Sequence, residues 1–130
     1  MKASSKRRDL AMYRIQQAEE SLDEAGLLHR SVINRVYYAM FYSILALLIF
    51  EPYSSSKHSG VLSYFNRRFV KQGEIPEDVG RAVNKAFDLR LRGDYKEQVF
   101  LTREQVEPYL GHARLCIDSV RKLLQGRGLI

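Results

Sequence analysis

The sequence predicts an all-α fold, an antiparallel four-helix bundle with an additional short helix. Three observations lead to this prediction. Apolar residues recur at helical spacing along most of the chain, glycine and proline separate these stretches, and no stretch alternates between apolar and polar residues as a surface strand does. The length of 130 residues fits one domain, for which we expect the bounds 1–130.

The first predicted helix carries one apolar stripe. Its members alternate at spacings of four and three residues: Ala11, Ile15, Ala18, Leu22 and Ala25. Charged residues lie on the opposite side, and Gly26 marks the end of the helix. We interpret the basic residues 1–8 as a solvated, partly frayed end of the chain that could add contacts to phosphate.

The second predicted helix, from about Leu28 to Phe50, is the least polar part of the chain. A membrane-spanning helix needs roughly 20 apolar residues, whereas the run from Val36 to Phe50 is shorter and lies between Arg35 and Glu51. We therefore expect no membrane contact. A helix that is apolar on all sides must be surrounded by other helices or covered by a second copy of the chain, so the run predicts a helical bundle and is compatible with a dimer.

Two shorter periodic stretches follow. The third helix begins near Lys57 and ends at Gly73, and the fourth extends from about Glu77 to Gly93. Their inward residues are Val61, Leu62, Phe65 and Phe69 in the third helix and Val79, Ala82, Val83, Ala86 and Phe87 in the fourth. The polar residues 94–100 are predicted to form an exposed loop.

The last predicted helix has a capping box at its start, in which Thr102 and Gln105 each cover a free backbone N–H group. Its apolar stripe again alternates at spacings of four and three residues: Val106, Leu110, Ala113, Ile117, Val120 and Leu124. Gly126 and Gly128 end the fold.

Composition restricts the partners and the compartment. A formal charge of +6 and a pI near 9.6 favour an acidic partner, with nucleic acid first, although the same charge can serve solubility alone. The single cysteine, Cys116, cannot form an intrachain disulfide, and no apolar leader follows the charged start. We therefore expect a cytoplasmic protein.

The spacing of potential ligands favours neither a metal site nor a cofactor site. The sequence has no His-x-x-x-His, Cys-x-x-Cys or Glu-x-x-His pair and no glycine-rich phosphate loop, so we expect no metal and no cofactor. Cys116 lies on an apolar stripe, and we interpret it as a buried hydrophobic residue rather than a nucleophile. We interpret His29 and His112 as ordinary surface or packing residues.

The segment "DLRLRGDYKE", residues 88–97, is the first candidate for a functional site. Arg90 and Arg92 can grip phosphate with paired N–H donors, and Asp94 can orient an arginine. Tyr95 can stack on a base, donate a hydrogen bond or transfer a proton. The alternative is a surface Arg–Asp pair with a turn tyrosine.

The segment "KHSG", residues 57–60, is the second candidate. Lys57 and His58, together with the free N–H groups of a helix start, could form an anion site. The alternative is an ordinary helix N-terminus with His58 in its first turn.

Three stretches resemble the HEPN domains, whose name stands for higher eukaryotes and prokaryotes nucleotide-binding. They are "AGLLHRSVINRVYYAMFYSILALL" at residues 25–48, "KHSGVLSYFNRRFVKQGEIP" at residues 57–76 and "AFDLRLRGDY" at residues 86–95. The resemblance covers most of the chain, in order, and is closest to the small stand-alone prokaryotic branch of the family.

The resemblance implies an antiparallel four-helix bundle with a short extra helix and a two-fold dimer with a cleft at its interface. It also implies a toxin of a toxin–antitoxin pair whose partner is a minimal nucleotidyltransferase. Active members are metal-independent ribonucleases with an arginine, four to six residues and then a histidine. In their chemistry the RNA 2′-hydroxyl attacks the adjacent phosphate, the arginine stabilises charge and the histidine assists proton transfer.

Carried over to this sequence, the motif arginine is Arg90, and Tyr95 stands where the histidine is expected. Tyrosine ordinarily ionises near a pKa of about 10 and is a poor base at neutral pH. We therefore expect weak ribonuclease activity or none, unless His58 substitutes from another helix. The resemblance also makes Tyr95 a candidate for adenylylation by the partner.

Two hypotheses remain open besides a purely structural dimer. The first is an RNA-cleaving toxin that uses Arg90 with Tyr95, helped by Asp94, Arg92 or His58. The second is a dimeric module that binds nucleotide or RNA beside a nucleotidyltransferase and performs no chemistry. The absent histidine favours the second hypothesis.

Overall fold

The computed structural model describes residues 4–25, 32–53, 55, 57–95 and 103–130, with only the helical backbone at residues 24–25, 32, 92–95, 103 and 105–106. Its elements are α1 (Ser5–Ala25), α2 (Val32–Leu48), α3 (His58–Phe65), a π-helical turn η2 (Asn66–Val70), α4 (Glu77–Tyr95) and α5 (Arg103–Gly126). All regular structure in this described part is helical, which confirms the predicted all-α fold.

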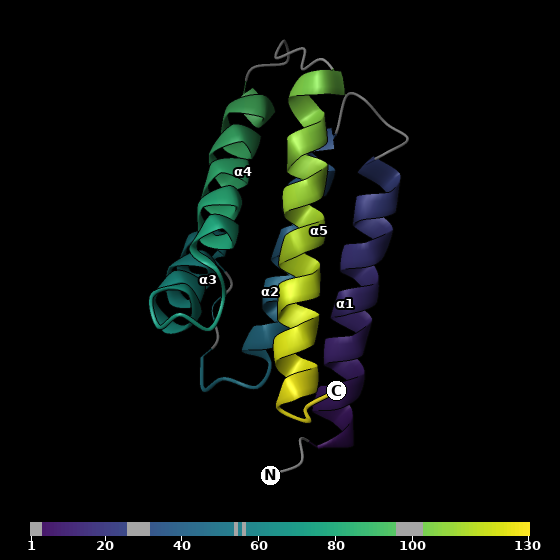
Figure 1. Ribbon diagram of the computed structural model, residues 1–130, viewed down its shortest axis with the longest axis vertical. Helices are drawn as coiled ribbons and strands as arrows, with labels where there is room; N and C mark the ends of the chain where they lie inside the picture. The colour runs from purple at the N-terminus through teal and green to yellow at the C-terminus, as the bar shows by residue number, and fades with distance from the viewer. Residues whose placement is uncertain (1–3, 26–31, 54, 56, 96–102) are drawn as a thin grey trace.

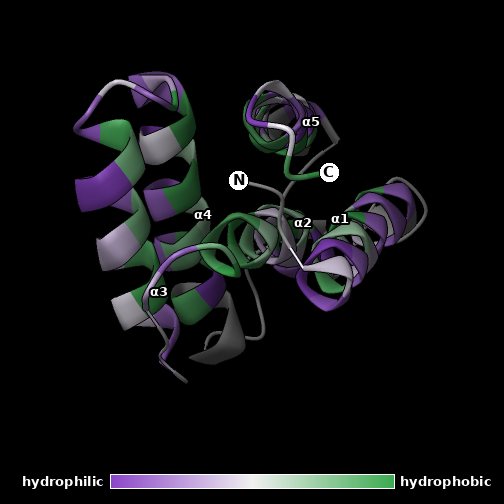
Figure 2. Cartoon of the chain, turned by 90° about the horizontal axis from the view of Figure 1, so that it is seen from below, coloured by the Kyte–Doolittle hydropathy of each residue, from purple (hydrophilic) through white to green (hydrophobic). Residues whose placement is uncertain are grey.

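Four long helices form an antiparallel bundle, and the short helix α3 lies across them (Figure 1). Helices α1, α2, α4 and α5 stand upright in Figure 1, whereas α3 is seen nearly end-on; the view from below in Figure 2 reverses this relation. Helix α2 is central, because it contacts α1, α3, α4 and α5. The predicted bundle with one additional short helix is therefore confirmed.

The buried position of α2 explains why its sequence is so apolar. Its fully buried side chains are Val36, Tyr37, Ala39, Met40, Ile44 and Ala46. The four helices that contact α2 supply the apolar neighbours that such a helix needs, as the green inner faces in Figure 2 illustrate. Among the residues that the structure describes, no helix is both long and apolar enough to cross a membrane.

The predicted apolar stripes of the other helices also face the core. Ala11, Ile15 and Ala18 of α1 are buried, and so are Ala113, Ile117, Val120 and Leu124 of α5. Phe65 of α3 and Phe69 of η2 are both fully buried, although the helix changes from α-helical to π-helical between them. Cys116 is fully buried beside the Ser43 hydroxyl, with 3.3 Å between Sγ and Oγ, and burial raises its pKa to about 12. A thiol in this state packs as a small hydrophobic group, as predicted.

Two predicted boundaries are wrong. Helix α4 does not end at Gly93 but continues to Tyr95, so Asp94 and Tyr95 belong to the helix and not to the start of a loop. An interior glycine costs a helix only about 1 kcal/mol relative to alanine, far less than proline, and packing can outweigh that cost. At the other end of the chain, α1 begins at Ser5, so residues 5–8 are helical rather than frayed.

The structure explains two other helix boundaries, and the remaining predicted boundaries lie outside the described residues. Helix α1 gains a cap from Ser4, whose Oγ accepts the Arg7 backbone N–H at 3.3 Å. Gly73 adopts a left-handed φ of 81° in the turn after η2, which explains the predicted break there. Thr102, residues 26–31 and most of the loop at 94–100 lie outside the described residues, and so does the side chain of Gln105.

Candidate phosphate-binding site

Arg90, near the end of α4, is the residue around which the candidate site is built. Its side chain crosses to α2, where Nε donates to the Asn34 Oδ1 and Nη2 donates to the Tyr38 hydroxyl, both at 3.0 Å. The guanidinium carbon lies 5.2 Å from the ring centre of Tyr37 and 5.1 Å from that of Tyr38. These distances are typical of cation–π contacts, so two directed hydrogen bonds and two aromatic rings fix the cation.

One face of α2 supplies all of these partners. Asn34, Tyr37, Tyr38 and Phe41 are spaced by three, one and three residues, which places them on a single side of the helix. The rings also contact one another: Tyr37 and Tyr38 lie 5.4 Å apart edge to face, and Tyr37 stacks with Phe41 at 5.6 Å. An aromatic surface of this kind holds its shape at little cost in side-chain entropy.

His58, the first residue of α3, lies against the same rings. Its Nδ1 is 3.0 Å from the Tyr37 hydroxyl, its ring stacks on Phe41 at 4.1 Å, and its edge meets Tyr38 at 6.1 Å. Burial and the positive charge of Arg90 both lower the pKa of His58 from its usual 6.5, so the imidazole is neutral at neutral pH. Burial also raises the pKa of Tyr37, whose phenol therefore remains protonated.

The sequence predicted two separate sites, and the structure brings a member of each together. Arg90 from "DLRLRGDYKE" and His58 from "KHSG" both contact Tyr37 and Tyr38. Lys57, by contrast, is exposed at the N-cap of α3, with its backbone N–H donating to the Ser55 Oγ at 3.1 Å.

The other predicted site residues fall at the edge of what the structure describes. Arg92, Asp94 and Tyr95 have helical backbone in α4, but their side chains lie outside the described part. The correction at Gly93 still bears on the motif, because positions 90 and 95 are now on one helix. Positions that are five apart on a helix lie about 140° apart around its axis, whereas positions four apart lie about 40° apart. Positions 90 and 95 therefore do not share one face of α4.

Asn34, Tyr37, Tyr38 and Phe41 were not predicted as site residues. The sequence does contain a signal: Asn34 and two tyrosines interrupt the most apolar helix of the chain. A buried tyrosine hydroxyl usually needs a hydrogen-bond partner, so polar groups on such a helix indicate a polar neighbour. The sequence does not reveal that this neighbour is Arg90 from α4 and His58 from α3.

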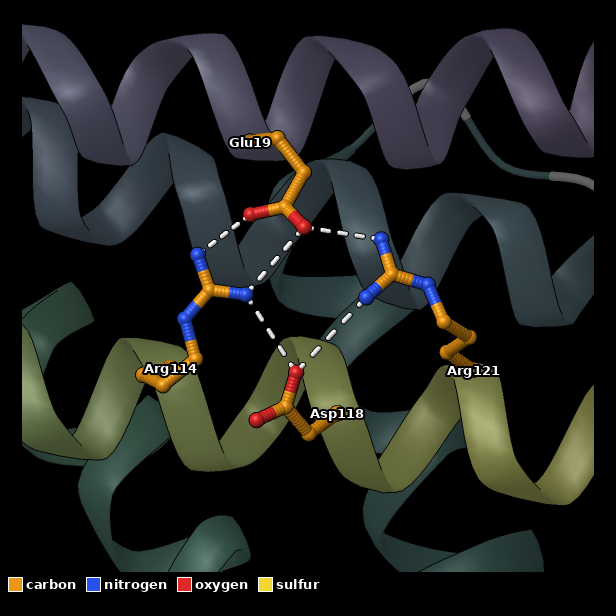
Figure 3. A network of polar contacts seen from close by, with 4 residues as sticks. All are labelled: Glu19, Arg114, Asp118 and Arg121. Atoms are coloured by element: carbon orange, nitrogen blue, oxygen red, sulfur yellow. Dashed lines mark hydrogen bonds and ion pairs between the residues drawn. The ribbon is translucent and has the colours of Figure 1, made fainter.

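A second group of arginines connects α5 with α1 (Figure 3). Glu19 accepts two hydrogen bonds from Arg114 and one from the Arg121 Nη2 at 2.8 Å. Asp118 lies between the arginines, 3.3 Å from the Arg114 Nη1 and 3.7 Å from the Arg121 Nη1. These hydrogen bonds lower the pKa of Glu19 to about 2, so its carboxylate is charged over nearly the whole pH range.

Two further features complete the picture. A groove between α1 and the end of α5 is lined by Met12, Tyr13, Gln16, Gln125 and Ile130 among others, and it includes none of the residues around Arg90. Within the described ranges, no three histidine, cysteine or acidic side chains are grouped so that they could hold a metal ion.

Comparison with known proteins places these features in a family context. The model of the HEPN domain matches residues 4–123. A "UPF0332 protein" of Thermotoga maritima is 42% identical over 113 residues, which cover 83% of this chain and 86% of that protein. "Putative toxin MJ0142" of Methanocaldococcus jannaschii is 30% identical over 121 residues, 89% of this chain and 82% of the relative. "Putative toxin MJ0605" of the same organism is 35% identical over 116 residues, 85% of this chain and 86% of the relative.

Proposed function

The chain belongs to the HEPN domain family, and from this premise we propose that it is the toxin-like component of a HEPN/nucleotidyltransferase pair. In this proposal the protein works in the cytoplasm and binds the phosphate of RNA or of a nucleotide around Arg90. Two copies meet about a two-fold axis, so that paired arginine sites face one groove. Two relatives carry the name "Putative toxin", which supports the toxin-like part of the proposal.

The geometry of Arg90 carries the proposal. Its partners on α2 are an amide oxygen, a phenol oxygen and two ring faces, all of which are neutral. They orient the guanidinium by two directed hydrogen bonds and two ring contacts. An oriented, charged guanidinium suits phosphate, which accepts two parallel N–H donors. The overall charge of +6 would further attract a polyanion.

The expected chemistry is weak or absent. Arg90 can stabilise charge on a phosphate during attack by the RNA 2′-hydroxyl, and this requires no metal. The residue at the expected position of the proton carrier is Tyr95, and tyrosine is a poor base at neutral pH. This substitution favours the second candidate function, a non-catalytic nucleotide-binding or structural partner subunit of a nucleotidyltransferase.

One experiment separates binding from cleavage. The purified protein is incubated with mixed RNA in EDTA beside Arg90→Ala, and Arg81→Ala serves as the matched control. Arg81 is on the same helix but is exposed and pairs with Glu77 at 3.7 Å. Cleavage that only Arg90→Ala lacks supports the toxin with ribonuclease activity, and Arg90-dependent binding without cleavage supports the non-catalytic module. Binding that does not weaken as salt rises contradicts a phosphate site altogether.

The dimer and the partner are tested separately. Sedimentation at micromolar concentration is expected to give a species of twice 15.1 kDa, and a monomer alone removes the shared groove from the proposal. For the pair, we expect a gene for a minimal nucleotidyltransferase beside the gene for this protein. We also expect the two gene products to co-purify. Co-purification that fails from a co-expressing cell contradicts the pairing.

A further inference from the structure

We infer that His58 is a second phosphate-binding cation of the Arg90 site and takes up one proton from solvent when a phosphate binds there. This inference rests on the proposed function, because it concerns the ligand of the same site. In this role His58 of α3 supplies a second positive charge to the phosphate beside that of Arg90 of α4.

The contacts of His58 leave one nitrogen for a ligand. Nδ1 is engaged by the Tyr37 hydroxyl at 3.0 Å, whereas no residue in the described part of the chain forms a hydrogen bond with Nε2. Phe41 covers one face of the ring at 4.1 Å and keeps its orientation. The side chain is half-buried, as is that of Arg90, so both remain within reach of a ligand.

The hydroxyl of Tyr37 is suited to both charge states of His58. A hydroxyl donates one hydrogen bond and accepts others, so it can donate to a bare Nδ1 or accept from Nδ1–H. When the imidazole is protonated, Nδ1–H donates to the Tyr37 oxygen and Nε2–H is available to a phosphate oxygen. The ring can therefore gain a proton without losing its anchor.

The surroundings explain why the proton arrives only with the ligand. From α4, Arg90 presents a positive charge that disfavours a second one, and from α2 the rings of Tyr37 and Tyr38 lie against the imidazole. Lys57, next in sequence, is a further cation on the exposed side. A bound phosphate adds negative charge between these groups and favours the imidazolium.

The test uses a ligand whose own charge is constant. An oligouridylate without terminal phosphates, carrying a dye insensitive to pH, is titrated into the full-length protein between about pH 8 and pH 5. We expect affinity to rise as the pH falls, by at most about tenfold per pH unit for one coupled proton. His58→Gln, which cannot gain the charge, is expected to bind at high pH and to lose this rise. His112→Gln, on the exposed face of α5, keeps it.

A direct measurement guards against an altered fold in the variant. Proton NMR of the wild-type protein follows the imidazole of His58 with and without the oligonucleotide, and its pKa is expected to rise on binding. Equal pH dependence in wild type and His58→Gln, or an unchanged pKa of His58, overturns the inference while Arg90-dependent binding leaves the proposed function standing. Absence of salt-sensitive binding at every pH overturns both.

Discussion

Two clusters of side chains in this protein hold arginine with different kinds of partner. In the cluster of Figure 3, Arg114 and Arg121 of α5 reach to Glu19 of α1, and Asp118 completes the balance of two positive and two negative charges. At the other cluster, Arg90 of α4 reaches to α2 and meets an amide, a phenol and two rings. The partners in the first cluster are carboxylates, and the partners of Arg90 on α2 are neutral groups that orient the guanidinium.

The pKa shifts express the same difference. The arginines of the first cluster lower the pKa of Glu19 to about 2, which stabilises the charged pair. At the other cluster, burial and the charge of Arg90 lower the pKa of His58, which disfavours a second positive charge beside Arg90. We interpret the first cluster as a tie between α1 and α5 and the second as a place for an anion. Mutations should therefore separate stability from binding.

The largest expected effect is on binding at the second cluster. Arg90→Ala should weaken binding of single-stranded RNA by about 1.5–3 kcal/mol, roughly ten- to a hundredfold, because charge-assisted hydrogen bonds to phosphate are lost. Arg90→Lys should recover only part of it, since a lysine keeps the charge without the planar fork. Fluorescence anisotropy at two salt concentrations measures the loss. Equal losses in Arg90→Ala and Arg114→Ala would abolish the distinction between the clusters.

The next effect is on stability at the first cluster. Glu19→Gln should lower the free energy of unfolding by about 1–2 kcal/mol, a figure reduced for the partial exposure of the pair, and should leave RNA affinity unchanged. Urea denaturation measures it. Glu20→Gln is the matched control, because Glu20 is exposed and its contact is with Gln16 on the same helix. A loss as large in the control would show that general charge, and not the tie between helices, is responsible.

A dependence of stability on pH follows from the same carboxylate. The folded pKa of Glu19, about 2, lies below its ordinary value of 4.5, so the unfolded chain binds the proton more readily. The stabilisation from Glu19 is therefore complete above pH 4.5 and is lost as the pH falls towards 2. Urea midpoints of wild type and Glu19→Gln should converge over this window. Parallel curves would mean that the pair contributes nothing.

Helical periodicity predicted most of the fold, because each helix buries one stripe and the stripes are visible one helix at a time. The stripes of α1, α3 and α5 needed no knowledge of their neighbours, and the run from Val36 to Phe50 required burial on all sides. Gly93 misled the prediction because glycine weakens a helix without forbidding it. In general, packing can carry a helix past a glycine, and packing is not visible in the sequence.

The candidate site was predicted only in pieces. Arg90 and His58 each stood out by residue type and local context, yet they are 32 positions apart and meet only because α3 and α4 pack on the same side of α2. The residues that join them, Tyr37 and Tyr38, read as ordinary members of a buried helix. Contacts between distant segments depend on how helices are rotated about their axes, and periodicity specifies that rotation only to within a broad face.

The smallest expected effect tests whether orientation of Arg90 matters beyond its charge. Tyr38→Phe removes the hydroxyl that accepts from the Nη2 and keeps the ring 5.1 Å from the guanidinium, so only the directed contact is lost. We expect RNA binding to weaken by about 0.5–1.5 kcal/mol, roughly two- to tenfold, with little change in the salt dependence. Tyr42→Phe is the matched control, because Tyr42 lies one turn further along α2 and its ring centre is 5.6 Å from that of Tyr38. If both variants bind as the wild type does, the two rings and Asn34 suffice to hold the cation, and the phenol is a packing residue. If Tyr38→Phe weakens binding and steepens the salt dependence, the guanidinium has become mobile and acts as an unoriented charge. That result would mean that the Tyr38 hydroxyl on α2 is needed to keep the guanidinium oriented.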